Sequence, residues 1–238
     1  MSKFYTEIAK YYDYIFPTGK AQLGLIKELA GEPPMKILDI ACGSGGYSKQ
    51  LSDLGYEITA VDLDPSMIRR LKEKDEKLDA RVLNMLDLDI LNDTYDLLFC
   101  IGNSLVHLNN NEEILEFFRK CRQRLKPGRN LLIQIVNYDR ILAKDITSLP
   151  LITNEEVGLT FERYYEYLPE RHKICFKTVL KVDGLSLENS VLLHPLKSVE
   201  LIELLRQAGF ITIETYGSFE KTVFDPLNSF SLIVVAQR

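Results

Sequence analysis

The chain has 238 residues, a formal net charge of −5 at pH 7 and 26% charged residues. This length fits one domain with room for an inserted segment, and the composition excludes collagen-like, disordered and disulfide-rich classes. The acidic balance argues against nucleic acid as a partner, because a phosphate backbone favours a basic surface. No stretch approaches the roughly 18 apolar residues of a membrane span. Residues 1–20 also lack the apolar core of a secretory signal.

The four cysteines lie far apart in the sequence and show no metal-ligand spacing. They are Cys42, Cys100, Cys121 and Cys175. Such isolated cysteines predict a reduced, cytoplasmic protein without a disulfide framework and without a bound metal. The oligomeric state stays open, a dimer included.

The first half of the chain alternates helical segments with short apolar runs. Two helices are expected within residues 1–30, separated at Pro17-Thr18-Gly19. Strands are then expected at 35–40, 57–61, 80–85, 95–101 and 131–136, and helices at 47–54, 64–71 and 111–125. This alternation predicts a parallel sheet with helices on both faces. Ligands of such sheets bind beyond the carboxyl ends of the strands.

Residues 150–194 break this alternation. Three strands are expected at 159–168, 174–182 and 185–193, with Asp183-Gly184 as a hairpin turn. A helix from Ser198 and strands at 210–216 and 230–235 complete the chain. We therefore predict an α/β fold with a doubly wound, mostly parallel, seven-stranded Rossmann-like sheet. Residues 1–149 and 195–238 would form the cofactor-binding domain, and 150–194 an inserted antiparallel β subdomain that acts as a lid over the substrate.

The run Ile37–Gly46 predicts a nucleotide-type site. A strand delivers Asp39 to its carboxyl end, glycines allow a sharp turn, and the next helix points free N–H groups at a ligand. Glycine-rich turns are common, so this run alone is weak support. Asp62 adds to it, because an acid at the end of the next strand can bind ribose hydroxyls. Its alternative role is helix capping, for which Asp64 is better placed.

The motif Asp39-x-Ala41-Cys42-Gly43-x-Gly45, the acid at Asp62 and the last two strands resemble the class I S-adenosylmethionine-dependent methyltransferases over nearly the whole chain. The resemblance implies S-adenosylmethionine as the cofactor, with its methionine part at residues 39–46 and its ribose at Asp62. Many members have an Asp where this chain has Met85, for which packing in the core is the alternative. The implied cofactor-binding residues are Tyr11, Asp39, Ala41, Gly43, Ser44, Gly45, Asp62, Leu63, Met67, Asn84, Met85, Leu86, Ile101 and Gly102.

Two further motifs resemble the glycine N-methyltransferase group within this superfamily. They are Gly102-Asn103-Ser104-x-x-His107-Leu108 and Asn137-Tyr138-Asp139. The resemblance implies Asn103 and His107 as catalytic and substrate-contacting residues, although His107 could instead cap a turn. That group has an Arg for the amino-acid carboxylate where this chain has Val136, so Arg140 or Arg163 would have to replace it. The substrate-binding residues predicted on this basis are Asn103, His107, Asn137, Arg163 and Tyr165.

Two aromatic clusters are expected to cover this site. The first is Tyr5, Tyr11, Tyr12 and Tyr14 in the amino-terminal helix, where an aromatic face can attract a sulfonium. The second lies at residues 161–167, where alternation along a strand places Phe161, Arg163, Tyr165 and Tyr167 on one face. Hydrophobic packing is the alternative for both clusters. The run Lys72–Lys77 is expected to be a solvated helix face.

Together these features predict an S-adenosylmethionine-dependent methyltransferase that acts on a small-molecule acceptor, at an amine nitrogen. O-methylation of a small acceptor and cofactor binding without turnover are the alternatives. A nicotinamide dehydrogenase is disfavoured by Asp39 and by the missing Gly-x-Gly-x-x-Gly pattern. No nucleic acid or membrane partner is expected.

Overall fold

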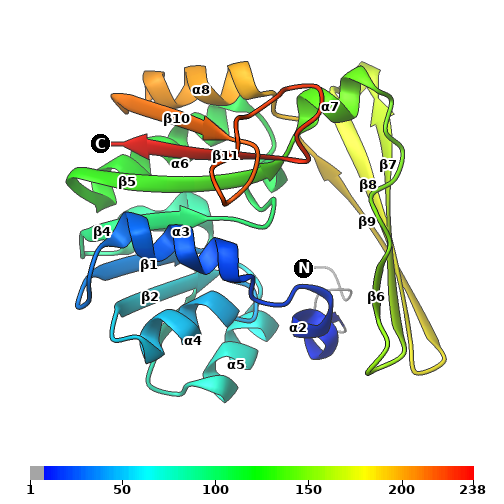
Figure 1. Cartoon of the computed structure of the whole chain (residues 1–238), viewed down its shortest axis with the longest axis horizontal. Helices are drawn as coiled ribbons and strands as arrows, with labels where there is room; N and C mark the ends of the chain where they lie inside the picture. Colours follow the sequence, from blue (N-terminus) through cyan, green and yellow to red (C-terminus); the bar gives the residue numbers. More distant parts are fainter. Residues whose placement is uncertain (1–7) are drawn as a thin grey trace.

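The computed structural model describes residues 8–238 and contains two β-sheets that face each other (Figure 1). Sheet A has seven strands in the order β10-β11-β5-β4-β1-β2-β3, and only β11 runs antiparallel to its neighbours. The prediction of a mostly parallel, seven-stranded α/β sheet is confirmed. Its strands are β1 Lys36–Ile40, β2 Glu57–Asp62, β3 Asp79–Val82, β4 Tyr95–Cys100, β5 Leu125–Val136, β10 Thr212–Tyr216 and β11 Ser231–Gln237.

Helices cover both faces of sheet A because its central strands are apolar on both sides. Along β1, Ile37 packs with the helices α3, α4 and α5, whereas Leu38 packs with α6 and α8 on the opposite face. All six residues of β4 are buried. The helices are α3 Lys20–Ala30, α4 Gly46–Asp53, α5 Pro65–Lys74, α6 Asn111–Arg124 and α8 Ser198–Gln207.

Two predicted boundaries of sheet A differ from the structure. The third strand was expected at 80–85, but β3 ends at Val82 because Asn84 caps the short helix η2 (Met85–Ile90) by accepting the Leu86 N–H at 3.0 Å. Strand β5 begins at Leu125 rather than at residue 131. It includes Lys126-Pro127-Gly128, directly after the helix that was expected at 111–125.

Sheet B is antiparallel, has the order β6-β7-β8-β9 and faces the carboxyl ends of the parallel strands (Figure 1). Its hairpin turn at Asp183-Gly184 has φ of 51° and 74°, the left-handed conformation that suits a two-residue turn. The short strand β6 adds to the three expected strands. The strands are β6 Ile152–Asn154, β7 Leu159–Leu168, β8 Lys173–Val182 and β9 Leu185–Leu193.

The amino-terminal segment lies between the two sheets (Figure 1). It contains the short helices η1 (Ala9–Tyr11) and α2 (Tyr12–Ile15). Ile8 and Ile15 pack in one buried cluster with Met67 of α5 and with Phe161 and Leu180 of sheet B. This cluster joins sheet B to the helical layer of sheet A. Tyr5 of the first aromatic cluster lies outside the described residues.

Three short helices complete the described chain: η3 Leu105–His107, α7 Tyr138–Ala143 and η4 Pro169–Arg171. Among residues 8–238, no helix is both long and apolar enough to cross a membrane.

Gly45 and Gly24 provide a matched test of the loop that follows β1. Gly45 has φ of 75°, and an added Cβ would lie 2.2 Å from the side chain of the buried Leu71. Gly45→Ala should therefore lower the free energy of unfolding by about 2–4 kcal/mol, through backbone strain and overpacking.

Gly24 is the control, since it lies exposed in α3 with open space around it. Gly24→Ala should stabilise the protein by about 0.5–1 kcal/mol. Urea denaturation of both variants measures the two effects. Equal stability of Gly45→Ala and wild type would contradict the packing described for this loop.

Candidate active site

The ends of β1 and β4 carry most of the backbone strain at the edge of sheet A that faces sheet B. Positive φ angles occur at Ala41 (58°), Gly43 (55°) and Gly45 after β1, and at Gly102 (80°) and Asn103 (69°) after β4. Ala41 and Asn103 are not glycines, and such residues tolerate this conformation only where surrounding structure enforces it. An added Cβ on Gly102 would meet nothing within 4 Å, so there is open space beside this turn.

Asp62 ties the glycine-rich loop to the end of β2. Its Oδ2 accepts the Gly43 N–H at 2.8 Å and its Oδ1 accepts the Asp64 N–H at 2.9 Å. Burial raises the pKa of this carboxyl, while the two backbone donors act in the opposite direction. The loop is therefore held on the same edge as an acidic group that can accept further hydrogen bonds from hydroxyls.

Asp39 lies deeper, at the end of β1, where it is buried. Ser48 of α4 donates its hydroxyl to Asp39 Oδ2 at 2.6 Å. Burial raises the pKa of Asp39 to about 7, and the negative charge of Asp62 acts in the same direction. Two neighbouring acids with raised pKa values favour a positively charged ligand, because such a ligand relieves their repulsion.

The amino-terminal segment covers the loop. A Cβ added to Gly43 would lie 2.9 Å from the Tyr12 ring, so the ring lies directly on this glycine. Ser44 donates its hydroxyl to Asp13, and Lys74 Nζ lies 2.7 Å from Asp13 Oδ2 and 2.9 Å from the Ser44 carbonyl oxygen. Lys74 was expected on a solvated helix face. It instead links α5, α2 and the loop, since a long side chain at the end of α5 can reach both.

Tyr11 contacts sheet B. Its hydroxyl donates to Asp183 Oδ2 at 3.0 Å, in the β8–β9 hairpin turn, and its side chain is buried. The neighbouring Tyr12 is the tyrosine that lies on the glycine-rich loop. The Tyr12 ring contacts the Phe16 ring (centroids 5.2 Å apart), and the Phe16 ring in turn contacts Phe161 of sheet B (centroids 5.8 Å apart). A cofactor contact by Tyr11 stays a prediction.

The structure brings most of the other predicted cofactor residues to this edge. Leu63, directly after β2, is 55% exposed, whereas Met67 is only 2% exposed and packs in the cluster under sheet B. Asn84 uses its side chain as a helix cap. Met85 and Leu86 are partly buried against the main core. The residues at the ends of β1, β2 and β4 are Asp39, Ala41, Gly43, Ser44, Gly45, Asp62, Leu63, Ile101 and Gly102.

Asn103 links the ends of β4 and β5. Its Oδ1 accepts the Val136 N–H at 2.9 Å and its Nδ2 donates to the Tyr138 hydroxyl at 3.0 Å. Gln134 adds to this link, because its Oε1 accepts the Gly102 N–H at 2.7 Å. The side chain of Asn103 therefore shapes the turn and leaves limited capacity for a substrate contact.

Asn137 supports the loop that precedes β11. It is fully buried, and its Nδ2 donates to the carbonyl oxygens of Pro226 (3.0 Å) and Ser229 (2.9 Å). Its Oδ1 caps α7 by accepting the Arg140 N–H at 3.3 Å. With these partners Asn137 has a structural role, and the predicted substrate contact gains no support from the geometry.

His107 ends η3, where β9 of sheet B also makes contact. The residue is partly open to solvent, but the protein around its ring desolvates the ring and thereby lowers its pKa. The ring is therefore mainly neutral at pH 7 and can accept a proton.

Tyr165 closes the other end of the site. Its ring lies 6.3 Å from that of Tyr138 and 5.2 Å from that of Phe176 on β8. Burial raises the pKa of Tyr165 to about 12, so its hydroxyl stays protonated. Arg163 lies two residues earlier on β7, on the same face of the strand.

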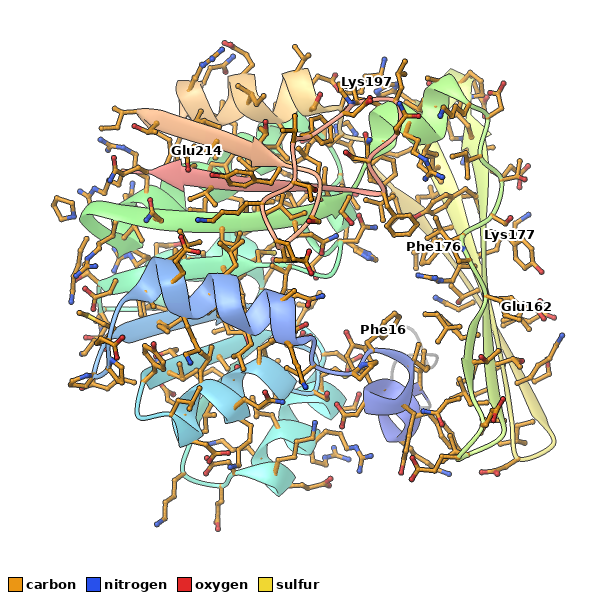
Figure 2. The ribbon with its side chains drawn as sticks, in the orientation of Figure 1. Phe16, Glu162, Phe176, Lys177, Lys197 and Glu214 are labelled. Carbon is orange, nitrogen blue, oxygen red and sulfur yellow. The ribbon has the colours of Figure 1, made fainter. Side chains whose placement is uncertain are left out.

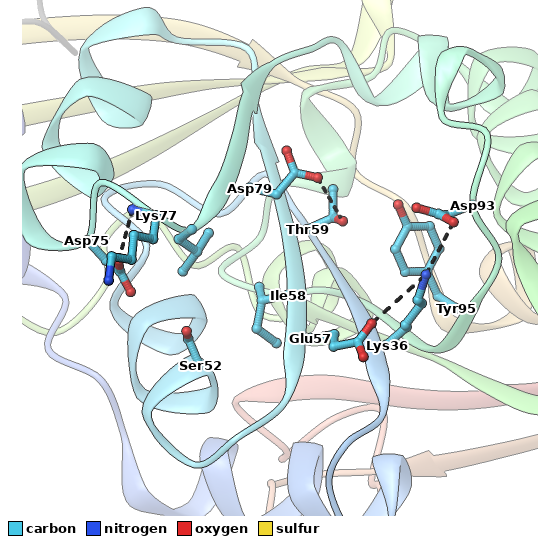
Figure 3. Close-up of a pocket in the computed structure, with 11 residues that line it drawn as sticks. Lys36, Ser52, Glu57, Ile58, Thr59, Asp75, Lys77, Asp79, Asp93 and Tyr95 are labelled. Carbon is cyan, nitrogen blue, oxygen red and sulfur yellow. Dashed lines mark hydrogen bonds and ion pairs between the residues drawn. The ribbon is translucent and has the colours of Figure 1, made fainter.

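A pocket at the opposite edge of sheet A does not belong to this site (Figure 3). It lies at the amino ends of the strands, and Lys36 pairs there with two acidic side chains. Lys36 Nζ lies 3.3 Å from Asp93 Oδ1 and 3.9 Å from Glu57 Oε2. Thr59 donates its hydroxyl to Asp79. No described carboxylate of the glycine-rich edge lines this pocket.

Sequence reasoning missed several residues of this edge. Asp13 and Lys74 had no motif around them, and Gln134 lies inside an apolar strand run. Tyr138 was noted only as part of a motif. Two signals could have revealed some of them. Gln134 is a polar residue within a buried strand, and Lys74 lies in the last turn of a helix that begins after an acidic residue.

Asp39 makes the stability of the protein depend on pH. In the folded protein its carboxyl keeps a proton up to about pH 7, whereas in the unfolded chain it ionises near pH 4. Between these values the folded state binds more protons, so the free energy of unfolding falls as the pH rises. Asp39→Asn keeps an acceptor for Ser48, and should be more stable than wild type by roughly 1–3 kcal/mol at pH 8.

The two proteins should differ little at pH 4–5, where the wild-type carboxyl is protonated in the folded state. Urea denaturation at pH 5 and pH 8 measures the difference. Asp53→Asn, at an exposed acid of α4, serves as the control and should change neither value. A variant that gains no stability at pH 8 would disprove the raised pKa of Asp39.

Known proteins share both the sequence pattern and the fold. A methyltransferase-domain family model matches residues 37–128. A glycine/sarcosine/dimethylglycine N-methyltransferase of Actinopolyspora halophila is 26% identical, over 83% of this chain and 35% of that protein. A glycine/sarcosine N-methyltransferase of Halorhodospira halochloris is 27% identical, over 84% of this chain and 74% of that protein. The present chain thus spans about a third of the first relative's length and three quarters of the second's.

Among solved structures, the CcbJ methyltransferase of Streptomyces caelestis has a TM-score of 0.83 at 21% identity, over 98% of this chain and 97% of that one. This likeness covers sheet B as well as sheet A. The family match includes the glycine-rich loop and Asp62, the residues whose geometry suits a cofactor with a positive charge and ribose hydroxyls. Residues 37–128 thus match the methyltransferase domain, and the chain as a whole has the fold of the class I S-adenosylmethionine-dependent methyltransferases.

Proposed function

We propose that this protein transfers a methyl group from S-adenosylmethionine to the amine nitrogen of a small molecule, with sheet B acting as the lid of the site. This proposal rests on the enclosure of the edge of sheet A that carries Asp39 and Asp62, here called the acidic edge. The amino-terminal segment and sheet B cover the carboxyl ends of β1 and β4 through the contacts Tyr12–Phe16–Phe161 and Tyr138–Tyr165. Such a covered site favours a small acceptor over a polymer.

The residues of the acidic edge fit the cofactor. Asp62 would hold the ribose hydroxyls, the loop at Gly43 and Gly45 the methionine part, and Leu63 the adenine. S-adenosylmethionine supplies a methyl group that is already activated on a sulfonium. The protein therefore has to align the acceptor and exclude water. Tyr12 and Phe16 would contribute to this exclusion, and their aromatic faces suit a cation.

An amine acceptor has to lose a proton before it can react, because an ammonium has no free electron pair. His107 is mainly neutral at pH 7 and ends η3, five residues after Gly102. It could accept this proton. The relatives from Actinopolyspora and Halorhodospira are named as N-methyltransferases, which supports nitrogen over oxygen as the acceptor atom.

The acceptor atom can be tested with matched amines and alcohols. Titration calorimetry first measures the binding of S-adenosylmethionine. Radiolabelled methyl transfer is then measured to glycine, sarcosine and ethylamine, and to glycolate and ethanol, the hydroxyl counterparts of glycine and ethylamine. Transfer to the amines is expected. Transfer to the hydroxyl compounds alone would indicate O-methylation, and tight cofactor binding without any transfer would indicate a binding protein.

Asp62→Asn should weaken the binding of S-adenosylmethionine about 10- to 100-fold. The variant loses the negative charge and one of two carboxylate acceptors, and a hydrogen bond to a charged group contributes about 1.5–3 kcal/mol. Calorimetry measures the loss.

Asp79→Asn is the control for this variant, because Asp79 lies at the start of β3, on the opposite edge, and pairs with Arg81. It should bind the cofactor as wild type does. Equal affinities for Asp62→Asn and Asp79→Asn would exclude Asp62 from the cofactor site.

His107→Gln should lower kcat for an amine acceptor about 100-fold at pH 7, since the variant cannot accept the proton. The deficit should shrink at pH 9–10, where the amine is deprotonated by the solvent. Cofactor affinity should stay unchanged.

His172→Asn is the matched control, at an exposed turn histidine with φ of 48°, a conformation that Asn tolerates. Its activity should follow that of wild type at every pH. An equal loss at all pH values in His107→Gln would point to a structural role for His107.

A further inference from the structure

A cavity of about 420 Å³, here called the α3 cavity, lies between α3, β5 and the loop of residues 217–230 that joins β10 to β11. Cavities of roughly 300–1,000 Å³ bind drug-sized molecules. An ion pair between Lys221 and Glu28 holds the loop against α3. The main lining residues are Ala21 and Gln22 of α3, Gln134 of β5, Phe219 and Phe230 of the loop, and Ile233 of β11.

The α3 cavity adjoins the acidic edge at two points. Gln134 lines the cavity, and its Oε1 accepts the Gly102 N–H at 2.7 Å in the turn after β4. An added Cβ on Gly102 would meet nothing within 4 Å, so the space beside this turn is open. At the start of α3, Thr18 lies against Gly46, the first residue of α4, since a Cβ on this glycine would lie 2.4 Å from Thr18 Oγ1. The cavity therefore borders both turns at which the cofactor and the acceptor would meet.

Aromatic rings of sheet B lie on the other side of the β4 turn. Tyr138, which bonds to this turn, contacts Tyr165, and Tyr165 contacts Phe176. Figure 2 shows Phe176 on the side of sheet B that faces sheet A. These three rings pack in the apolar cluster on the α6 face of sheet A, whereas the walls of the α3 cavity pack on the opposite face. A bulky group on the acceptor thus meets these rings on one side and finds room on the α3 side.

Three large apolar side chains line the α3 cavity: Phe219, Phe230 and Ile233. Phe219 is partly buried against the core next to α3, and Phe230 is 42% exposed. Arg140 supports the Phe230 ring through a cation–π contact, with its guanidinium 5.8 Å from the ring centre. Aromatic side chains attract another ring through offset or edge-to-face contacts in addition to burial. The walls therefore suit an aromatic group.

The charge of the lining favours an amine over an acid. Among the described residues that line the cavity, Glu220 is the single charged one, and no lysine or arginine is present. A carboxylate would lose water there without gaining a cation as its partner. Gln134 uses its Oε1 for Gly102, so its Nε2 is the group left to donate to a polar atom of a ligand.

We propose that the α3 cavity holds an aromatic group of the acceptor, so that the substrate is an arylalkyl amine. Its amine would lie at the β4 turn, and its ring would pack between Phe219, Phe230 and Ile233. Glycine and sarcosine carry no group that could fill this space. This proposal rests on the proposed N-methyltransferase function and adds the class of its acceptor.

Two amines that differ by one phenyl ring test the proposal: ethylamine and 2-phenylethylamine. KM and kcat are measured by methyl transfer from S-adenosylmethionine, and affinity is measured by calorimetry on the protein saturated with S-adenosylhomocysteine. Wild type should have a KM at least about 10-fold lower for 2-phenylethylamine, because burial of a ring of this size contributes that factor or more.

Ala21→Phe places a ring in the α3 cavity and should raise KM for 2-phenylethylamine about 10-fold or more relative to KM for ethylamine. Its affinity for S-adenosylmethionine should stay within twofold of wild type. Gly24→Phe is the matched control, because it adds the same side chain to the same helix at an exposed position with open space around it. It should keep the preference of wild type. Comparison between variants also removes any effect of the different basicity of the two amines.

Phe230→Ala removes one wall of the cavity and should reduce the preference for 2-phenylethylamine about 5-fold. Leu227→Ala is its control, since Leu227 is a 51% exposed apolar residue of the same loop that does not line the cavity. It should behave as wild type. Thermal unfolding checks that every variant is folded, and Phe230→Ala decides the question if Ala21→Phe is not.

The outcomes separate the two proposals. Equal KM values of wild type for the two amines would overturn the role of the α3 cavity, as would transfer to glycine without transfer to 2-phenylethylamine. A preference that persists in both Ala21→Phe and Phe230→Ala, or that is lost equally in Gly24→Phe, would overturn it too. In each of these cases the N-methyltransferase function stands. A lack of transfer to every amine, or a failure to bind S-adenosylmethionine, would overturn the function itself.

Discussion

The hydrogen bond from the Gly43 N–H to the Asp62 carboxylate fixes the geometry on which the rest of the site depends. It joins the turn after β1 to the end of β2, and it is possible only because parallel strands end at the same edge. The positive φ of Gly43 directs this N–H toward the neighbouring strand, and the missing side chain leaves room for the Tyr12 ring. The Asp62 carboxylate, the turn at Gly43 and the Tyr12 ring are thereby held close together, and Asp39 is buried at the end of β1.

The amino-terminal segment connects this edge to sheet B. Tyr12 lies on the glycine-rich loop, Phe16 contacts Phe161, and Tyr11 donates to Asp183 in the hairpin turn. The ion pair between Asp13 and Lys74 holds the same segment against α5. One short segment therefore contacts the glycine-rich loop, α5 and sheet B.

Sequence patterns predicted sheet A well because each of its central strands is a short apolar run between turn-forming residues. β4 shows this most clearly, since all six of its residues are buried. The start of β5 was missed because Lys126-Pro127-Gly128 has the composition of a turn, whereas backbone pairing with β4 and the chain end extends the strand through it. Tertiary pairing here overrides the local preference.

Within the site, sequence motifs located the turns but could not assign the side chains. Asn103 and Asn137 match family motifs, yet their amides bond to backbone groups of neighbouring loops. Lys74 and Thr178 have no motif, and their surroundings arise from elements far away in the sequence. The inner face of sheet B depends on the register of β7, β8 and β9, which follows from turn geometry and from packing against the main domain.

The two acids at the carboxyl ends of β1 and β2 have a consequence for the proposed reaction. Asp39 and Asp62 on the edge of sheet A would favour the ammonium form of an acceptor, which cannot react. A neutral base near the acceptor, the role proposed for His107, would offset this effect by accepting the proton of the ammonium.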